Sequence, residues 1–140
     1  MTTFVDTNIF LYALDERQDA RHDVAAGILE QLWEARDGGV STQVLQELYV
    51  NLTRKLRKPM TRPRARAIIE RYAAWPVHQV TPADIISASE LEQRHTMAFW
   101  DALVVVAAQR LGAERILTED MQHGRTFGGV RIENPFRQGR

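Results

Sequence analysis

The sequence contains no cysteine, and its hydrophobic runs are short. The lack of thiols excludes thiolate zinc sites, thiol redox motifs and a disulfide framework, and it agrees with a reducing compartment. No stretch approaches the roughly 18 apolar residues that a membrane-spanning helix needs, and the first residues carry no basic segment of a secretory signal. We therefore expect a soluble, cytoplasmic protein. At 140 residues the chain fits one domain, residues 1–140, with one buried core.

The chain also has no formal net charge, because its 18 basic residues balance 18 acidic ones. The charges are, however, unevenly distributed along the sequence. Residues 54–71, which we call the basic segment, contain eight bases and one acid and so carry +7, while the rest of the chain carries −7. Such a concentration is the electrostatic footprint of a polyanion-binding protein. A solvated helix face is the commoner explanation of a charge run. The eight bases are Arg54, Lys55, Arg57, Lys58, Arg62, Arg64, Arg66 and Arg71.

Strand-like and helix-like segments alternate along the chain. This alternation predicts an α/β fold with a mostly parallel sheet covered by helices on both faces. We expect a second helix, with Val24, Ile28, Leu29 and Leu32 on its apolar side, to end at Asp37-Gly38-Gly39. The apolar run Ala102–Ala108 should form a helix that is buried all round. The expected strands, short runs rich in β-branched or aromatic residues, are residues 2–5, 40–42, 77–80, 115–118 and 129–132.

Four carboxylates occupy comparable positions in this pattern. Asp6 and Asp120 follow expected strands, whereas Glu47 and Asp101 interrupt apolar helical runs. The carboxyl ends of parallel strands meet at one edge of a sheet, where open α/β proteins keep their ligand sites. Clustering four ionised carboxylates is costly, because each raises the pKa of the others until a cation neutralises them. Oxygen ligands without cysteine favour Mg²⁺ or Mn²⁺, so the sequence predicts a site for one or two such ions.

Each of these acids also has an ordinary structural interpretation. Asp6 could cap a helix, Asp101 could complement a helix dipole, Glu47 could pair with an arginine, and Asp120 could serve a turn. The recurrence of all four at the strand-edge side of the fold favours a common site. The sequence leaves open whether Asp120 or its neighbour Glu119 faces the ion. The groups placed to hydrogen-bond the ligands are Thr7, Asn8, Thr118 and Glu119.

These residues resemble the PIN-domain family, and more narrowly the VapC-type toxins of bacterial toxin–antitoxin pairs. The resemblance covers essentially the whole chain, and the acids occur in the order and approximate spacing of the family. The segments that carry it are Phe4-Val5-Asp6-Thr7-Asn8-Ile9-Phe10, Val44-Leu45-Gln46-Glu47-Leu48-Tyr49, Trp100-Asp101-Ala102-Leu103-Val104 and Leu117-Thr118-Glu119-Asp120-Met121-Gln122-His123-Gly124.

The resemblance implies a three-layer α/β/α sandwich, a Mg²⁺- or Mn²⁺-dependent endoribonuclease, a homodimer and a VapB-type antitoxin that blocks the site. It implies that Asp6 and Asp101 are the central metal ligands, and that Glu47 and Asp120 complete the catalytic acidic pocket. The basic segment falls in the helical region that flanks the cleft in this family. RNA phosphate contacts are therefore expected from Arg54, Lys55, Arg62, Arg64 and Arg66.

Other enzymes that hold Mg²⁺ at strand ends fit less well. Haloacid-dehalogenase phosphatases need a second aspartate two residues after the first, where this chain has Asn8, and response-regulator receivers need a lysine after a late strand, whereas no lysine follows Lys58. A PIN-fold module without activity and a stand-alone nuclease without an antitoxin remain as alternatives. DNA-cleaving PIN enzymes usually carry further acids and longer insertions, for which 140 residues leave little room. We expect in-line hydrolysis of an RNA phosphodiester by a water that the cation activates.

Overall fold

The computed structural model describes residues 1–15 and 19–137. Its described residues form a six-stranded sheet in the order β3-β2-β1-β4-β6-β5. Every neighbouring pair is parallel except β5 and β6, so the predicted, mostly parallel sheet is confirmed. The strands are β1 (Thr3–Val5), β2 (Gly38–Ser41), β3 (Val77–His78), β4 (Arg115–Leu117), β5 (Thr126–Phe127) and β6 (Val130–Glu133).

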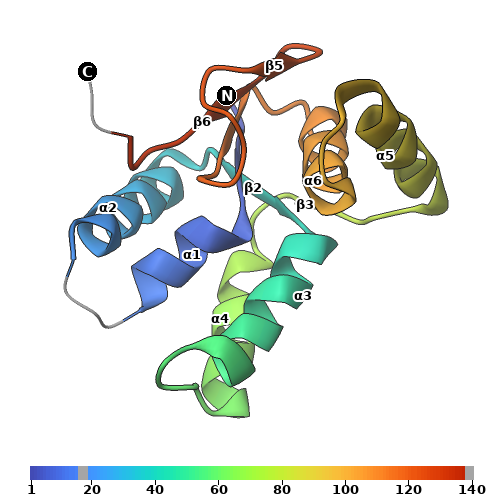
Figure 1. The fold of residues 1–140 in the computed structure, drawn as a ribbon. Coiled ribbons are helices and arrows are strands. Elements are labelled where there is room, and N and C mark those ends of the chain that lie inside the picture. Colours follow the sequence, from blue (N-terminus) through green and yellow to red (C-terminus); the bar gives the residue numbers. More distant parts are fainter. Residues whose placement is uncertain (16–18, 138–140) are drawn as a thin grey trace.

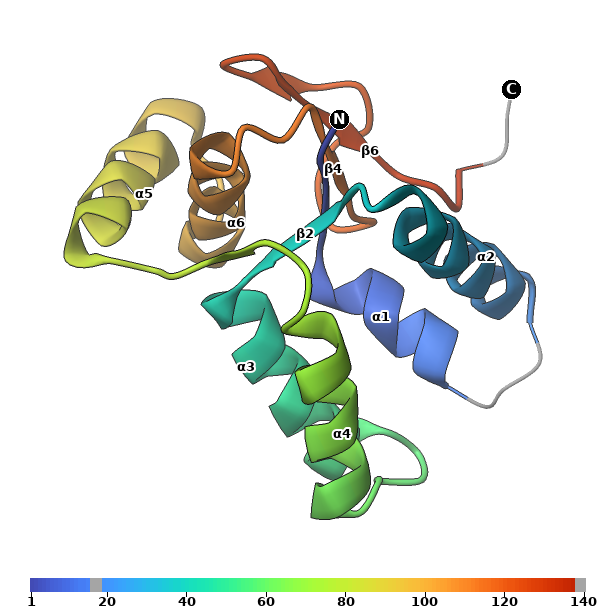
Figure 2. The same cartoon turned by 180° about the vertical axis from the view of Figure 1, so that it is seen from behind.

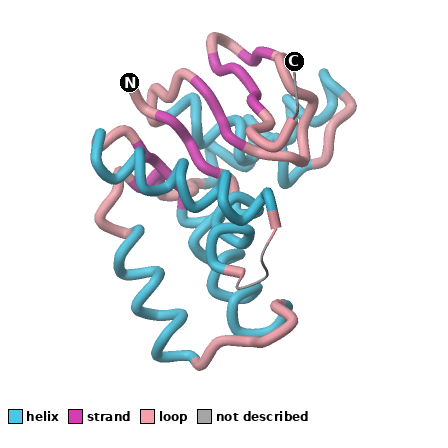
Figure 3. Tube along the Cα trace, turned by 90° about the vertical axis from the view of Figure 1, so that its left-hand side faces the viewer, coloured by secondary structure: helices cyan, strands magenta, loops and turns pink. Residues whose placement is uncertain are grey.

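Helices cover both faces of this sheet, which gives the three-layer α/β/α sandwich (Figures 1 and 2). Helices α5 and α6 lie on one side, and α1 and α2 lie on the other. The pair formed by α3 and α4 extends beyond one end of the strands (Figure 3). The helices are α1 (Thr7–Leu14), α2 (Ala20–Ala35), α3 (Thr42–Val50), α4 (Arg62–Tyr72), α5 (Pro82–His95) and α6 (Phe99–Arg110), and a π-helical turn, Asn51–Lys55, follows α3 directly.

Apolar residues of the central strands and of α6 form the core. Phe4, Val5 and Ile116 are fully or almost fully buried between the helical layers, as two-sided parallel sheets require. Every residue of Ala102–Ala108 is buried, which confirms the expectation for α6. This rigid centre fixes the strand ends, from which the polar residues of the candidate site extend. Within the described residues, no helix has the length and apolar character needed to cross a membrane.

The second helix ends immediately before Asp37-Gly38-Gly39, as expected, but neither glycine forms its cap. Helix α2 stops at Ala35, and Arg36 adopts the left-handed conformation that caps it, with φ of 58°. Gly38 and Gly39 belong to strand β2 instead. Glycine is needed at this position of the strand, because a Cβ atom at Gly38 would lie 2.7 Å from the ring of Trp75. This glycine serves a close strand-to-tryptophan contact rather than a helix stop.

Candidate active site

The candidate site lies where the order of the strands reverses direction. The chain builds β1, β2 and β3 in one direction across the sheet and then places β4 on the other side of β1. Such a switch point leaves a crevice at the carboxyl ends of the strands. Asp6 directly follows β1, and Thr118 directly follows β4. Helix α3, which carries Glu47, starts directly after β2.

Helix starts surround the same crevice. Asp6 is the N-cap of α1, and Asp101 lies in the first turn of α6, so both structural interpretations offered by the sequence are correct as local descriptions. Helix α6 ends shortly before β4 begins, and its N-terminus therefore lies at the carboxyl edge of the sheet. With the N-terminus of α3, three helix dipoles direct their positive ends toward the four acids. These dipoles partly offset the concentration of negative charge.

Two of the predicted acids, Glu47 and Asp120, lie close enough to the other two to raise their pKa values. Burial raises the pKa of Asp6 to about 7, and the charges of Asp120 and Glu47 add to this rise against hydrogen bonds from Thr118 and Thr7 that lower it. Burial also raises the pKa of Asp101, again with contributions from Asp120 and Glu47. Asp6 is only 5% exposed, whereas Asp120 faces solvent. The cluster is therefore buried at Asp6 and open to solvent at Asp120.

Two threonines hold the carboxylates of the buried side. The backbone N–H of Thr7 donates to Oδ1 of Asp6 at 2.8 Å, and the hydroxyl of Thr118 donates to Oδ2 of Asp6 at 2.8 Å. The hydroxyl of Thr7 donates to Oε1 of Glu47 at 2.7 Å. Thr7 thus links the first strand end to helix α3, and both threonines occupy the supporting positions that the sequence suggested.

Asn8 holds the open side of the cluster. Its amide Nδ2 donates to Oδ2 of Asp120 at 3.0 Å and to Oγ1 of Thr118 at 3.2 Å. Its Oδ1 accepts the backbone N–H of Glu119 at 3.3 Å, which fixes the loop after β4. The side chain of Asn8 therefore connects the start of α1 to Asp120 and to the loop that carries it.

The structure distinguishes the neighbouring acids Glu119 and Asp120. The carboxylate of Glu119 accepts a 2.6 Å hydrogen bond from the hydroxyl of Tyr12 and lies 3.8 Å from Nε of Arg21. It is thus turned toward α1 and α2. Asp120 is the member of the pair that acts on Asp6 and Asp101 electrostatically. Glu119 supports the site through its backbone N–H rather than through its carboxylate.

Gln43 is a part of the site that the sequence did not indicate. Its Nε2 donates to Oε2 of Glu47 at 3.3 Å and to the backbone carbonyl of Trp100 at 3.2 Å. Because both neighbours only accept hydrogen bonds, the amide orientation is fixed. Gln43 is 5% exposed, and its Oε1 has no hydrogen-bond partner among the described residues. Its position four residues before Glu47 in α3 is the only sequence signal for this role.

The donor set fits a hard divalent cation in its chemistry. All four groups are oxygen ligands, and among the described residues Asp6 has carboxylates as charged neighbours and no ion pair with a cation. In the described part of the chain, however, no three carboxylate or imidazole groups converge closely enough to enclose one ion in this conformation. Asp6 and Glu47 accept hydrogen bonds from the protein, and an ion held by three of these groups would therefore require side-chain movement.

The five predicted RNA-binding residues are all exposed. Arg54 and Lys55 end the π-helical turn, and the other three lie in the first turns of α4. They belong to the α3–α4 pair that projects from the strand ends (Figures 1 and 3). None of them is paired with the four acids by an ion pair among the described residues. Positive and negative charge are therefore separated on neighbouring elements.

Comparison with known proteins agrees with this arrangement. Ribonuclease VapC23 of Mycobacterium tuberculosis is 35% identical over 122 residues, which are 84% of this chain and 91% of that protein. A crystal structure of VapC20 from the same organism, described as a sarcin–ricin-loop-cleaving toxin, superposes with a TM-score of 0.64 at 27% identity and covers 82% of this chain and 87% of that one.

A toxin–antitoxin complex from Klebsiella pneumoniae matches in fold, with a TM-score of 0.69 at 19% identity over 98% of this chain and 100% of that one. The PIN-domain family model matches residues 3–126, which include all four acids. The resemblance predicted from the sequence is thus confirmed, and this chain belongs to the PIN-domain family.

Proposed function

We propose that this protein is a Mg²⁺- or Mn²⁺-dependent endoribonuclease that hydrolyses phosphodiester bonds of cytoplasmic RNA and serves as the toxin of a type II toxin–antitoxin pair. The observation that carries the proposal is the carboxylate cluster at the switch point, with Asp6 buried and uncompensated. The ribonuclease relative, which the chain matches over 91% of that protein's length, supports RNA as the substrate.

Each acid has a proposed role. Asp6 and Asp101 are the central metal ligands and, with Glu47 and Asp120, form the catalytic set that holds one or two ions. A bound divalent cation lowers the pKa of a water ligand and neutralises charge on the phosphoryl oxygens. Thr118 and Thr7 keep the buried carboxylates in fixed orientations, and Asn8 does so for Asp120. The helix N-termini stabilise the negative charge that accumulates when phosphate enters the crevice.

A VapB-type antitoxin and a homodimeric assembly are parts of the same proposal. The relatives support the first part, since the Klebsiella pneumoniae structure is described as a toxin–antitoxin complex and VapC20 as a toxin. A small coding neighbour for a DNA-binding protein, and suppression of toxicity when both proteins are coexpressed, are the expected observations. Toxicity that such a neighbour does not suppress favours a stand-alone nuclease.

The central experiment compares Asp6→Asn with the wild type and with Asp23→Asn, which changes an exposed aspartate at the start of α2. Cleavage of a labelled RNA with Mn²⁺ or Mg²⁺ should fall at least about 100-fold in Asp6→Asn and stay unchanged in Asp23→Asn. Chelator should abolish wild-type cleavage. Sequencing RNA ends after induced expression then identifies the target and the cut position.

A second readout separates binding from activity. Mn²⁺ should raise the melting temperature of the wild type and of Asp23→Asn, but not that of Asp6→Asn, because a ligand that binds only the folded state stabilises it. A thermal shift without RNA cleavage identifies a binding module and rejects the enzymatic proposal. Full RNA cleavage by Asp6→Asn rejects the role given to the carboxylate cluster.

A further inference from the structure

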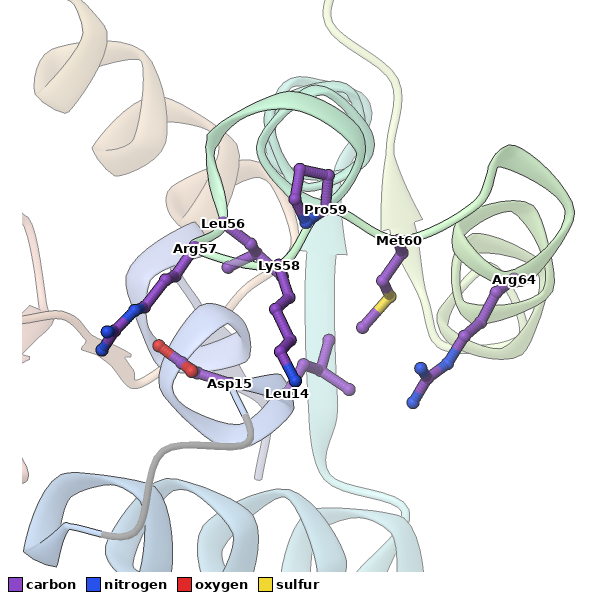
Figure 4. Close-up of a pocket in the computed structure, with 8 residues that line it drawn as sticks. All are labelled: Leu14, Asp15, Leu56, Arg57, Lys58, Pro59, Met60 and Arg64. Atoms are coloured by element: carbon purple, nitrogen blue, oxygen red, sulfur yellow. The ribbon is translucent and has the colours of Figure 1, made fainter.

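A groove leads from the carboxylate cluster along one side of α1. Its inner part is a pocket of about 260 Å³ lined by Asn8, Tyr12, Asn51 and Lys55 among others. Its outer part is a pocket of about 560 Å³ between the end of α1, the α3–α4 connection and α4 (Figure 4). The two pockets share Asp15 and Leu56 as lining residues, so they are contiguous. We call the two together the side groove.

The inner end of the side groove shares a wall with the candidate active site. Asn8 lines the inner pocket and donates a hydrogen bond to Asp120, which belongs to the acid cluster. Glu119 lines the same pocket and is the chain neighbour of Asp120. The inner pocket therefore adjoins the residues that hold the acid cluster.

Charge changes sign along the groove. The four acids lie beyond its inner end, and Glu119 lines the inner pocket. Among the described residues, the outer pocket is lined by Arg57, Lys58 and Arg64 and by one acid, Asp15. Lys55 lines the inner pocket at the transition between the two. A phosphodiester backbone needs positive charge to hold it beside a cluster of carboxylates, and basic side chains spaced along a groove provide it.

The outer pocket also offers apolar contact surface. Leu14, Leu56 and Met60 contribute to its lining, and Figure 4 shows the side chains of Lys58, Met60 and Arg64 directed toward the end of α1. Apolar surface bordered by cations suits an unpaired strand, which exposes base faces and phosphates together. A paired helix would present its phosphates but no base faces to this surface.

We propose that single-stranded RNA on one side of the cut phosphodiester lies in the side groove, with phosphates bound by Lys55, Arg57, Lys58 and Arg64. This inference rests on the proposed ribonuclease function and adds the path of the substrate. It replaces the sequence-based expectation for the basic segment: Lys55 and Arg64 line the groove, whereas Arg54, Arg62 and Arg66 are absent from the lining of both pockets and are no longer assigned RNA contacts. Arg57 and Lys58 enter the set on structural grounds alone.

The basic segment offers a matched pair of variants for the test. The groove variant is Lys55→Gln/Arg57→Gln/Lys58→Gln, and the control variant is Arg54→Gln/Arg62→Gln/Arg66→Gln. Both remove three positive charges from exposed residues of the same segment, so the change in net charge is identical. Circular dichroism and melting temperature should match the wild type in both, because exposed substitutions change stability little.

Binding is measured with a fluorescent single-stranded RNA in chelator, which prevents cleavage, at several salt concentrations. The groove variant should bind at least about tenfold more weakly, and its log–log salt slope should be smaller by about 2, since each lost phosphate contact contributes about 0.7. The control variant should stay within about threefold of the wild type. Equal losses in the two variants, or no loss in either, overturn the groove assignment.

Substrate length provides an independent test. Cleavable RNAs are shortened from the 5′ or the 3′ end toward the identified cut site, and kcat/KM is measured with Mn²⁺. Shortening the RNA on the side that lies in the groove should remove the difference in kcat/KM between the groove variant and the wild type. Shortening it on the other side should preserve that difference. A difference that is insensitive to both truncations contradicts the proposed path.

The outcomes also separate this inference from the function on which it rests. If the wild type does not cleave RNA, the proposed function fails, and the path fails with it. If the wild type cleaves RNA and the groove variant equals the control variant, only the path fails. A groove variant with normal RNA binding but lost antitoxin binding assigns the groove to a peptide and overturns the RNA proposal.

Discussion

Asp6 and Asp84 are equally inaccessible aspartates in very different surroundings. Asp6 is 5% exposed and Asp84 is 2% exposed. Burial alone would raise the pKa of both carboxyls, yet the pKa of Asp6 rises to about 7, whereas that of Asp84 falls to about 2. The neighbours therefore decide the outcome.

Cations and donors of the protein surround Asp84. Nε2 of His78 lies 2.7 Å from its Oδ2, Nε of Arg110 lies 3.2 Å from its Oδ1, and the backbone N–H of Thr81 donates to it at the start of α5. Asp6 receives hydrogen bonds from Thr7 and Thr118 but has other carboxylates as its charged neighbours. The negative charge of Asp84 is neutralised by groups of this chain, whereas that of Asp6 is not and can be neutralised by a bound cation. This difference separates a structural acid from a candidate metal ligand.

The largest expected effect is the opposite response of these two carboxyls to pH in metal-free protein. Asp6 has a raised folded pKa, so the folded state binds the extra proton and stability falls as pH rises from about 4 to about 7, by on the order of 4 kcal/mol. Asp84 has a lowered folded pKa, so its contribution is complete above about pH 4 and is lost toward pH 2, by on the order of 2 kcal/mol.

Urea unfolding in chelator between pH 2 and pH 9 measures both effects. Asp6→Asn should remove the decline between pH 4 and pH 7 and leave the acid limb unchanged. Added Mn²⁺ should flatten the same decline in the wild type, because the ion favours the charged carboxylate. An identical decline in Asp6→Asn and in the wild type would show that Asp6 is compensated in the free protein.

A smaller effect is expected from removing the compensated acid. Asp84→Asn leaves His78 and Arg110 without their shared carboxylate and should lower stability at pH 7 by about 2–3 kcal/mol, discounted because Arg110 is about half exposed. Asp6→Asn should not lower stability at pH 7 in chelator. At temperatures well below melting, Asp84→Asn should still cleave RNA, whereas Asp6→Asn should not. Equal stability of Asp84→Asn and the wild type contradicts the structural assignment.

The sequence allowed the fold and the four acids to be predicted because their signals are local. Strand patterns, the apolar run of α6 and acids at strand ends depend on a few neighbouring residues, and a parallel sheet brings strand ends together. The role of Gly38 in β2 was not predicted because it depends on a contact with Trp75, which lies far along the chain. The orientations of Glu119 and Asp120 depend on Tyr12, Arg21 and Asn8, which no local pattern specifies.

Gln43 illustrates the same limit and provides the smallest predicted effect. Its amide joins Glu47 of α3 to the carbonyl of Trp100, next to Asp101 in α6, so it sets the spacing of two candidate ligands. Gln43→Met keeps the volume and removes both hydrogen bonds. It also removes an unpartnered buried oxygen, Oε1, so stability should change by less than about 1 kcal/mol.

Activity and ion affinity should respond although stability does not. Loss of an outer hydrogen bond to a metal ligand typically lowers ion affinity or activity 10- to 100-fold, and we expect the low end for Gln43→Met because Thr7 still holds Glu47. The required Mn²⁺ concentration should rise about tenfold, and excess Mn²⁺ should restore most of kcat. A loss of kcat that Mn²⁺ does not restore would mean that Gln43 contacts the substrate, and unchanged Mn²⁺ dependence with full activity would remove Gln43 from the site.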